Sequence, residues 1–273
     1  MGVRVRGRRW LGAAVAMGLL AAGCGGGSKG GAAGNVGNPF AKGAQGQLSA
    51  LKGCQPTSHG SKWHYLAHTA SKPPAYTVAA GTPQVGATLK GWPTTPMVVL
   101  GNCSNTEAWV YSMADAKNFY LAVKVDSTLP VVAGTDAAPW SGDVVQFGVD
   151  GADDRANHPG NPGGYDSSDD SEMGMILLSG APSLFENYGP NQTMPPGSIS
   201  GGQVAITREN GVTLYEAAVP WGVMMAKPGK TFGFNVALSA GGAPYQSPNY
   251  GFEWTHGIIG TKWPYAFAQL TAK

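Results

Sequence analysis

The sequence predicts an all-β fold, an antiparallel β-sandwich of about nine strands with jelly-roll or immunoglobulin-like character. Charged residues make up only 12% of the 273 residues, while 42 glycines and 20 prolines favour turns and short strands. No window shows a sustained apolar period of 3.6 residues, so long amphipathic helices are not expected. The length suffices for one sandwich domain with additional segments.

The expected strands are runs of β-branched, aromatic or alternating residues bounded by turn residues. The clearest run covers residues 118–126, where Phe119, Leu121, Val123 and Val125 alternate with more polar positions. A long acidic loop is expected over residues 151–171, and a single helical turn over residues 220–225. The nine strands are expected at residues 97–100, 107–113, 118–126, 143–150, 174–179, 203–208, 212–219, 231–239 and 265–271.

The N-terminus has the composition of an export signal. Four arginines precede an apolar segment, residues 10–22, that is too short to span a membrane comfortably. This segment ends in Leu20-Ala21-Ala22-Gly23-Cys24, which resembles the lipobox of bacterial lipoprotein signal peptides. The resemblance implies cleavage after residue 23 and lipidation of Cys24, with an ordinary secretory signal as the alternative. The expected location is therefore the cell envelope, with the exported protein lipid-anchored on a periplasmic or extracellular face.

The remaining chain divides into three segments. Residues 24–46 are expected to form a flexible Gly-rich tether, residues 47–75 a pre-domain segment, and residues 76–273 the sandwich. Loss of the signal peptide changes the formal charge from +2 to −2, because it removes four basic residues and no acidic one. Nucleic acid is therefore not an expected partner.

Two cysteines remain besides Cys24. Cys54 and Cys103 form an even pair in a protein expected to be exported, so we predict a disulfide between them, with two free thiols as the alternative.

An ordered set of stretches resembles a family 9 carbohydrate-binding module or its wider DOMON-like relatives. The set covers the whole expected sandwich, residues 76–273. It comprises DAKNFYLAVKV (115–125), WSGDVVQFGVD (140–150), LYEAAVPW (214–221), FGFNV (232–236), Trp254, Trp263 and FAQL (267–270). The resemblance implies a β-sandwich that binds glycans without catalysis.

The resemblance also implies site residues. Two tryptophans of the family enclose a terminal sugar ring, and the matching positions here are Trp140 and Trp263. A polar family residue falls on Gln146. The family's arginine on the next strand has no counterpart, because residues 172–175 read Glu-Met-Gly-Met.

The chemistry of sugars supports such a site independently of the resemblance. Sugar rings stack their C–H faces on aromatic rings and require fixed polar partners for their hydroxyls. Trp254, near a strand end, and Asn235 are further candidates for a glycan or other small polar ligand. The alternative is that these tryptophans are core or rim residues.

Other chemistries were weighed against glycan binding. The loop aspartates 150, 153, 154, 166, 169 and 170 offer oxygen ligands for Ca²⁺, with a solvated loop as the alternative. Haem is a second cofactor alternative, because DOMON-like relatives include haem-binding members; the candidate ligands are His59, His64, His68, Met97, Met113, Met173 and Met175. A ligand-free scaffold or interaction sandwich is the third function considered. We predict no enzyme: Glu107 and Glu216 are not placed together by any pattern, and HExxH, GxSxG and CxxC do not occur.

Overall fold

The computed structural model describes one compact unit of the chain, within Pro39–Lys273. The described residues are 57–59, 63–67, 74–101, 106–127, 142–155, 164–166, 168–189, 198–240, 249–255, 257–258 and 262–273. The predictions for the signal peptide, Cys24, the Cys54–Cys103 disulfide and Trp140 all fall outside them. No helix among the described residues is long and apolar enough to cross a membrane.

The described residues form fourteen strands and one short 3₁₀ helix, η3 (Pro264–Ala266). The strands are β1 (Thr57–His59), β2 (Trp63–Ala67), β3 (Ala75–Ala80), β4 (Val98–Gly101), β5 (Thr106–Ala114), β6 (Asn118–Ser127), β7 (Val144–Asp150), β8 (Asp170–Leu178), β9 (Ala181–Tyr188), β10 (Gln203–Glu209), β11 (Val212–Pro220), β12 (Thr231–Ala240), β13 (Asn249–Glu253) and β14 (Ala268–Ala272).

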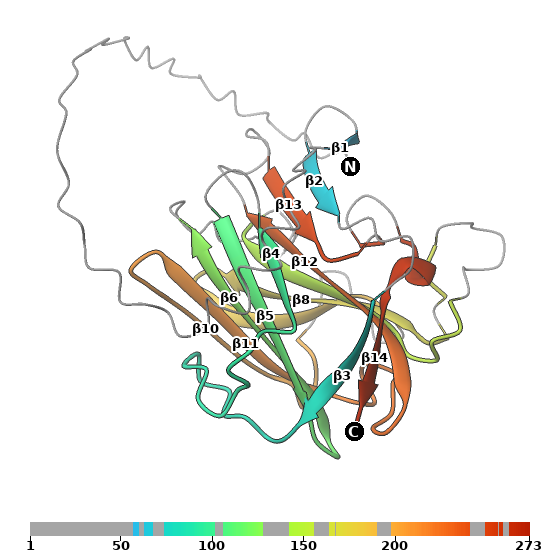
Figure 1. Cartoon of the computed structure of the whole chain (residues 1–273). Helices are drawn as coiled ribbons and strands as arrows, with labels where there is room; N and C mark the ends of the chain where they lie inside the picture. The colour runs from blue at the N-terminus through green and yellow to red at the C-terminus, as the bar shows by residue number, and fades with distance from the viewer. Residues whose placement is uncertain are drawn as a thin grey trace, which may run out of the picture. The chain divides into compact units, whose positions relative to one another are not determined.

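The strands build two sheets (Figure 1). Sheet A runs β9-β8-β7-β12. On its other edge, β12 pairs with β14 through residues 231–234 and with β13 through residues 237–240. Beyond β13 lie β2 and β1. Sheet B runs β4-β5-β6-β11-β10. Strand β3 joins the sheets, because it pairs first with β14 and then with β5.

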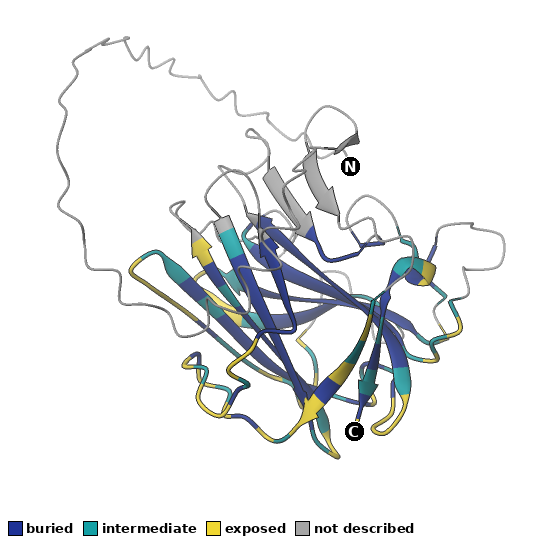
Figure 2. Cartoon of the chain, in the orientation of Figure 1, coloured by how far each residue is buried: buried dark blue, intermediate teal, exposed yellow. Residues whose placement is uncertain are grey.

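The main core lies between the two sheets and is rich in aromatic side chains (Figure 2). From β6, Phe119, Leu121, Val123 and Val125 all belong to it, as their alternation predicts. Phe119 meets Phe234 of β12 at 5.4 Å between ring centroids. Because side chains alternate along a strand, the remaining positions face outward, and on both sheets these outward faces are also largely covered.

The outward face of sheet B is covered by a loop that a buried carboxylate holds in place. Glu216 of β11 is fully buried, and four successive backbone N–H groups, from Gly86 to Leu89, donate to its two oxygens at 2.6–3.1 Å. Ala87 and Leu89 both adopt a left-handed φ of 53°, a conformation found in loops whose successive N–H groups converge on one anion. Glu216 therefore has a structural role, which removes it from any catalytic pair with Glu107.

We expect Glu216→Gln to lower the free energy of unfolding by about 2–4 kcal/mol, because an amide cannot accept from all four N–H groups. Urea unfolding followed by tryptophan fluorescence measures the change. The matched control is Glu209→Gln on the adjacent strand, where the side chain is exposed and the change should stay within about 0.5 kcal/mol. Equal stability of the two variants would contradict the role of Glu216.

All nine predicted strands are present, but the structure contains five more strands than the sequence predicted. The structure adds β1, β2, β3, β9 and β13. Strand β8 begins at Asp170 inside the expected acidic loop, and residues 265–267 precede β14 rather than forming part of it. Residues 221–225 form turns and no helix. The added strands are short or carry Gly, Pro and Asn, so their pairing partners, not their own residue pattern, decide their conformation.

Candidate ligand-binding site

The candidate site lies on the outward face of sheet A. Val145, Phe147 and Val149 of β7 point into the core, so Gln146 and Gly148, with Asp150, point outward. The register carries this face across the sheet. Gln146 lies opposite Gly174 and Ala237, Gly148 opposite Glu172 and Asn235, and Asp150 opposite Asp170 and Gly233.

Glycine on this face makes room for aromatic rings. A Cβ at Gly148 would lie 2.6 Å from Cζ of Phe267 and 3.2 Å from the hydroxyl of Tyr165. Phe267 and Tyr165 therefore lie directly against the sheet, where they form a small apolar cluster with Ala237 and Ile258. This cluster places the Tyr165 hydroxyl among the polar side chains of β7 and β8.

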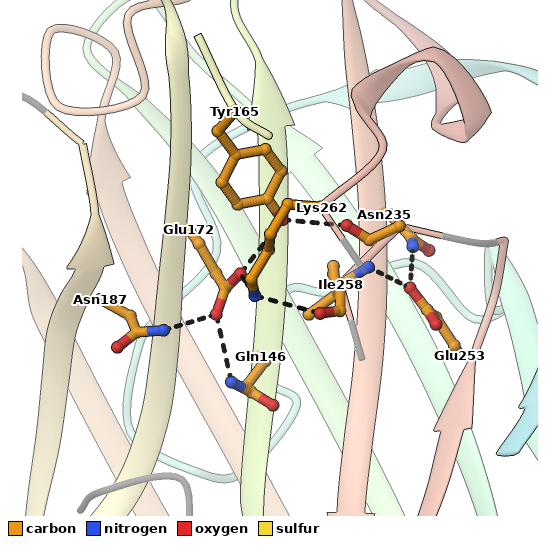
Figure 3. A network of polar contacts seen from close by, with 9 residues as sticks. Gln146, Tyr165, Glu172, Asn187, Asn235, Glu253, Ile258 and Lys262 are labelled. Atoms are coloured by element: carbon orange, nitrogen blue, oxygen red, sulfur yellow. Dashed lines mark hydrogen bonds and ion pairs between the residues drawn. The ribbon is translucent and has the colours of Figure 1, made fainter. Parts of the chain in front are cut away.

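Glu172 of β8 is the centre of a polar network on this face (Figure 3). Its carboxylate is fully buried. One oxygen accepts from the amides of Asn187 at 2.7 Å and Gln146 at 3.3 Å, and the other from the Tyr165 hydroxyl at 3.1 Å and the Lys262 ammonium. Every donor is a side chain, so no backbone N–H group is committed to Glu172 among these bonds.

A second group of bonds anchors the segment that carries Ile258. Glu253 at the end of β13 accepts from the Asn235 amide at 2.7 Å and from the Ile258 N–H. The Asn235 carbonyl oxygen accepts from the backbone of Val236 and Thr255, each at 2.9 Å. The Tyr165 hydroxyl also lies 3.1 Å from the Gly257 carbonyl. These bonds fix the backbone beside the Glu172 network.

An aromatic pair follows Lys262 in the chain. The rings of Trp263 and Tyr265 stack at 5.7 Å between centroids, with an interplanar angle of 23°. Trp263 is partly exposed, and its backbone N–H donates to the Gly257 carbonyl at 3.2 Å. Among the described residues, Tyr265 is the one large apolar residue that is exposed, with an exposed fraction of 42%. The pair thus offers an accessible flat surface next to Lys262.

The predicted site residues lie in different surroundings. Gln146 belongs to the Glu172 network, and Trp263 belongs to the aromatic pair. Asn235 is on the same face but fully buried and bonded within the protein, so it positions its neighbours. Trp254 is corrected to a core residue: it is 5% exposed and packs edge-on against Tyr76. Trp140 lies outside the described residues.

Four network residues were not predicted from the sequence. Glu172 was noted only as part of a stretch lacking an arginine, while Tyr165, Asn187 and Lys262 were not singled out. Lys262 is next to Trp263, and a cation beside a candidate stacking residue was a signal that could have been followed. Tyr165 and Asn187 carried no such signal, because they reach Glu172 only through the fold.

An acidic cluster lies near this network, at the β7–β8 end. Oxygens of Asp150, Asp169 and Asp170 all lie within 4.8 Å of one another, a spacing that suits a hard cation such as Ca²⁺. Burial, followed by the charges of neighbouring aspartates such as Asp169, raises the pKa of Asp150 to about 6 and that of Asp170 to about 8. These three residues are the described candidates for a metal site.

The raised pKa values predict a pH dependence of stability. Both carboxyl groups hold their protons in the folded chain at pH values where the unfolded chain has lost them. Without divalent cations, the free energy of unfolding should therefore decrease as the pH rises from about 4, where these carboxyl groups ionise in the unfolded chain, to about 8, the pKa of Asp170 in the folded chain. Asp170→Asn stays neutral and should flatten this decrease. Urea unfolding in EDTA measures both proteins, and identical pH profiles would contradict the assignment.

The haem alternative loses its methionine candidates. Met173 and Met175 are fully buried in the main core, Met97 accepts from the Ser112 hydroxyl at 3.3 Å, and Met113 packs beneath the sheet B loop. The side chains of His59, His64 and His68 lie outside the described set.

Comparison with known proteins gives a likeness of fold. No family model and no curated protein matches the sequence. A carbohydrate-binding module of family 9 from Caldicellulosiruptor kristjanssonii, solved with cellotriose, is 17% identical, with a TM-score of 0.52; the match covers 72% of this chain and 92% of that one. The module solved with glucose is 16% identical, with a TM-score of 0.54 and coverage of 73% and 95%. The chain therefore has the fold of a family 9 carbohydrate-binding module, as the resemblance predicted.

Proposed function

We propose that this protein binds a glycan without catalysis, through the outward face of sheet A. The observation that carries the proposal is the Glu172 network, whose Lys262 directly precedes the accessible Trp263–Tyr265 pair in the chain. The fold supports it, since two solved structures of this fold hold cellotriose and glucose. The scaffold alternative gains no comparable support, because it leaves this arrangement of exchangeable polar groups without a purpose.

The chemistry of binding follows from the groups present. A sugar ring stacks its C–H face on the accessible aromatic surface at Trp263 and Tyr265. Its hydroxyls accept from Gln146, Asn187 or Lys262 and donate to Glu172. Trp140, at the start of the segment that leads into β7, is proposed as the second aromatic wall. The ligand is thereby recognised by one flat face and a row of polar groups at its edge.

The test is isothermal titration with cellotriose and glucose against the mature chain. We expect weak binding, with Kd values in about the tens of micromolar to millimolar range, because the polar groups exchange bonds that they already make. Trp263→Ala and Tyr265→Ala should each weaken binding by about tenfold or more with little change in the thermal midpoint.

Trp254→Phe is the matched control, because Trp254 belongs to the core. It should lower the thermal midpoint and leave the affinity of any bound sugar unchanged. Wild-type protein that binds neither sugar nor any member of a glycan array would refute the glycan proposal, as would full affinity in both site variants. A Soret band in the absorbance spectrum of the purified protein would favour the haem alternative instead.

We also propose that the protein is held at a membrane of the cell envelope by lipid on Cys24. The support is the lipobox-like stretch before it. Acyl chains contribute ~0.8 kcal/mol per buried CH₂, so two or three chains give lasting attachment. Cys24→Ser should release the protein from the membrane fraction or leave its signal uncut. Mature-sized Cys24→Ser protein that still sediments with membranes would disprove the anchor.

A further inference from the structure

The ammonium group of Lys262 lies in a receptor of three different groups. Its Nζ donates to the Glu172 carboxylate and, at 3.0 Å, to the carbonyl of Ile258. It also lies 5.4 Å from the centre of the Tyr165 ring. A carboxylate, a carbonyl and an aromatic face are the partners that hold a primary ammonium ion.

This receptor does not depend on Lys262 for its shape. Gln146 and Asn187 fix Glu172 from the strands on either side of it. The Tyr165 hydroxyl bonds to Glu172, and the Tyr188 hydroxyl donates to the Tyr165 carbonyl at 2.8 Å. Removal of the lysine side chain therefore leaves the receptor formed and without a cation.

The two partners of the ion pair differ in exposure. The Glu172 side chain is fully buried, whereas that of Lys262 is 39% exposed. The lysine thus reaches the carboxylate from the solvent side, and its stem marks a path by which another group can enter. A neutral group in that place would leave a buried charge uncompensated, which is costly.

The surrounding face carries further acidic groups. Asp150 and Glu253 occupy outward positions on the same sheet as Glu172, whereas the neighbouring Asp170, with its pKa raised to about 8, adds little charge at neutral pH. Burial, followed by the charges of Glu172, Glu253 and Asp170, raises the pKa of Tyr165 well above its usual value. A field of this sign attracts a cationic ligand and repels an acidic sugar.

We propose that the Glu172–Ile258–Tyr165 receptor recognises the amino group of a cationic sugar, a hexosamine with a free amine, and that Lys262 occupies the receptor until such a ligand displaces it. The proposal rests on the proposed function, since Trp263 and Tyr265 supply the surface for the sugar ring. It names the class of sugar that this site takes. Lys262 then acts as a tethered competitor, with the high effective concentration of a group on the same chain.

The first experiment tests the receptor without a sugar. Lys262→Ala should lower the thermal midpoint, and propylammonium should restore it, because the small cation fills the vacated place beside Glu172. The same concentration of propanol should not. In Lys230→Ala, where an exposed lysine is removed, propylammonium should have no effect. A Lys262→Ala midpoint that responds equally to propylammonium and propanol would overturn the proposal.

The second experiment compares glucosamine, N-acetylglucosamine and glucose by titration. Lys262→Ala should bind glucosamine at least about tenfold more tightly than the wild type does, since the tethered competitor is gone. The two neutral sugars should show no such gain. Glu172→Gln/Lys262→Met removes both charges, keeps the volume of each side chain close to the original, and should lose the preference for glucosamine.

The outcomes separate this proposal from the general function. If Lys262→Ala binds glucose as tightly as glucosamine, glycan binding stands and the ammonium receptor is overturned. A glucosamine preference that persists in Glu172→Gln/Lys262→Met also overturns it. Absence of binding by all three sugars, in wild type and variants alike, counts against the glycan function and therefore against both.

Discussion

A buried carboxylate on the outward face of each sheet determines how that sheet is covered. Glu216 on sheet B and Glu172 on sheet A are both fully buried, and neither charge is tolerated there unless its oxygens are bonded. On sheet B the donors are four successive backbone N–H groups of one loop. On sheet A they are side chains from four separate segments. Backbone donors fix a cover, whereas side-chain donors can exchange partners, so sheet A is the face suited to a ligand.

The core and the site are specified by the same strand register. Strand β7 places Phe147 in the core and Gln146 and Gly148 on the outward face. A slip of one residue against β8 or β12 would expose the apolar set and bury the polar one. Packing of Phe147 against Phe234 therefore also holds Gln146 beside Glu172. The register of β7 against β8 and β12 therefore determines both the stability of the sandwich and the geometry of the site.

The sequence predicted the fold class and the long strands because their signal is local. Strand β6 alternates so regularly that its residues alone identify it, whereas β9 and β13 depend on pairing. The site was predicted only where the resemblance gave a position, at Gln146 and Trp263. Lys262 and Glu172 lie 90 residues apart, so no spacing pattern shows their contact. Trp254 was a candidate for the ligand site because it lies near a strand end, yet its backbone N–H donates to the Val236 carbonyl at 2.9 Å and its ring enters the core.

The bonds already present at Glu172 also determine what a ligand can gain there. Each sugar hydroxyl that binds must replace an internal bond of similar strength, so the net gain per polar contact stays below the about 1 kcal/mol of an ordinary hydrogen bond. Stacking on Trp263 and Tyr265 replaces no such bond, because Tyr265 faces solvent. In the proposed mode of binding, the aromatic surface therefore contributes most of the affinity. The Glu172 network would contribute selectivity, since a ligand that cannot compensate this buried carboxylate must leave Lys262 in place and bind around it.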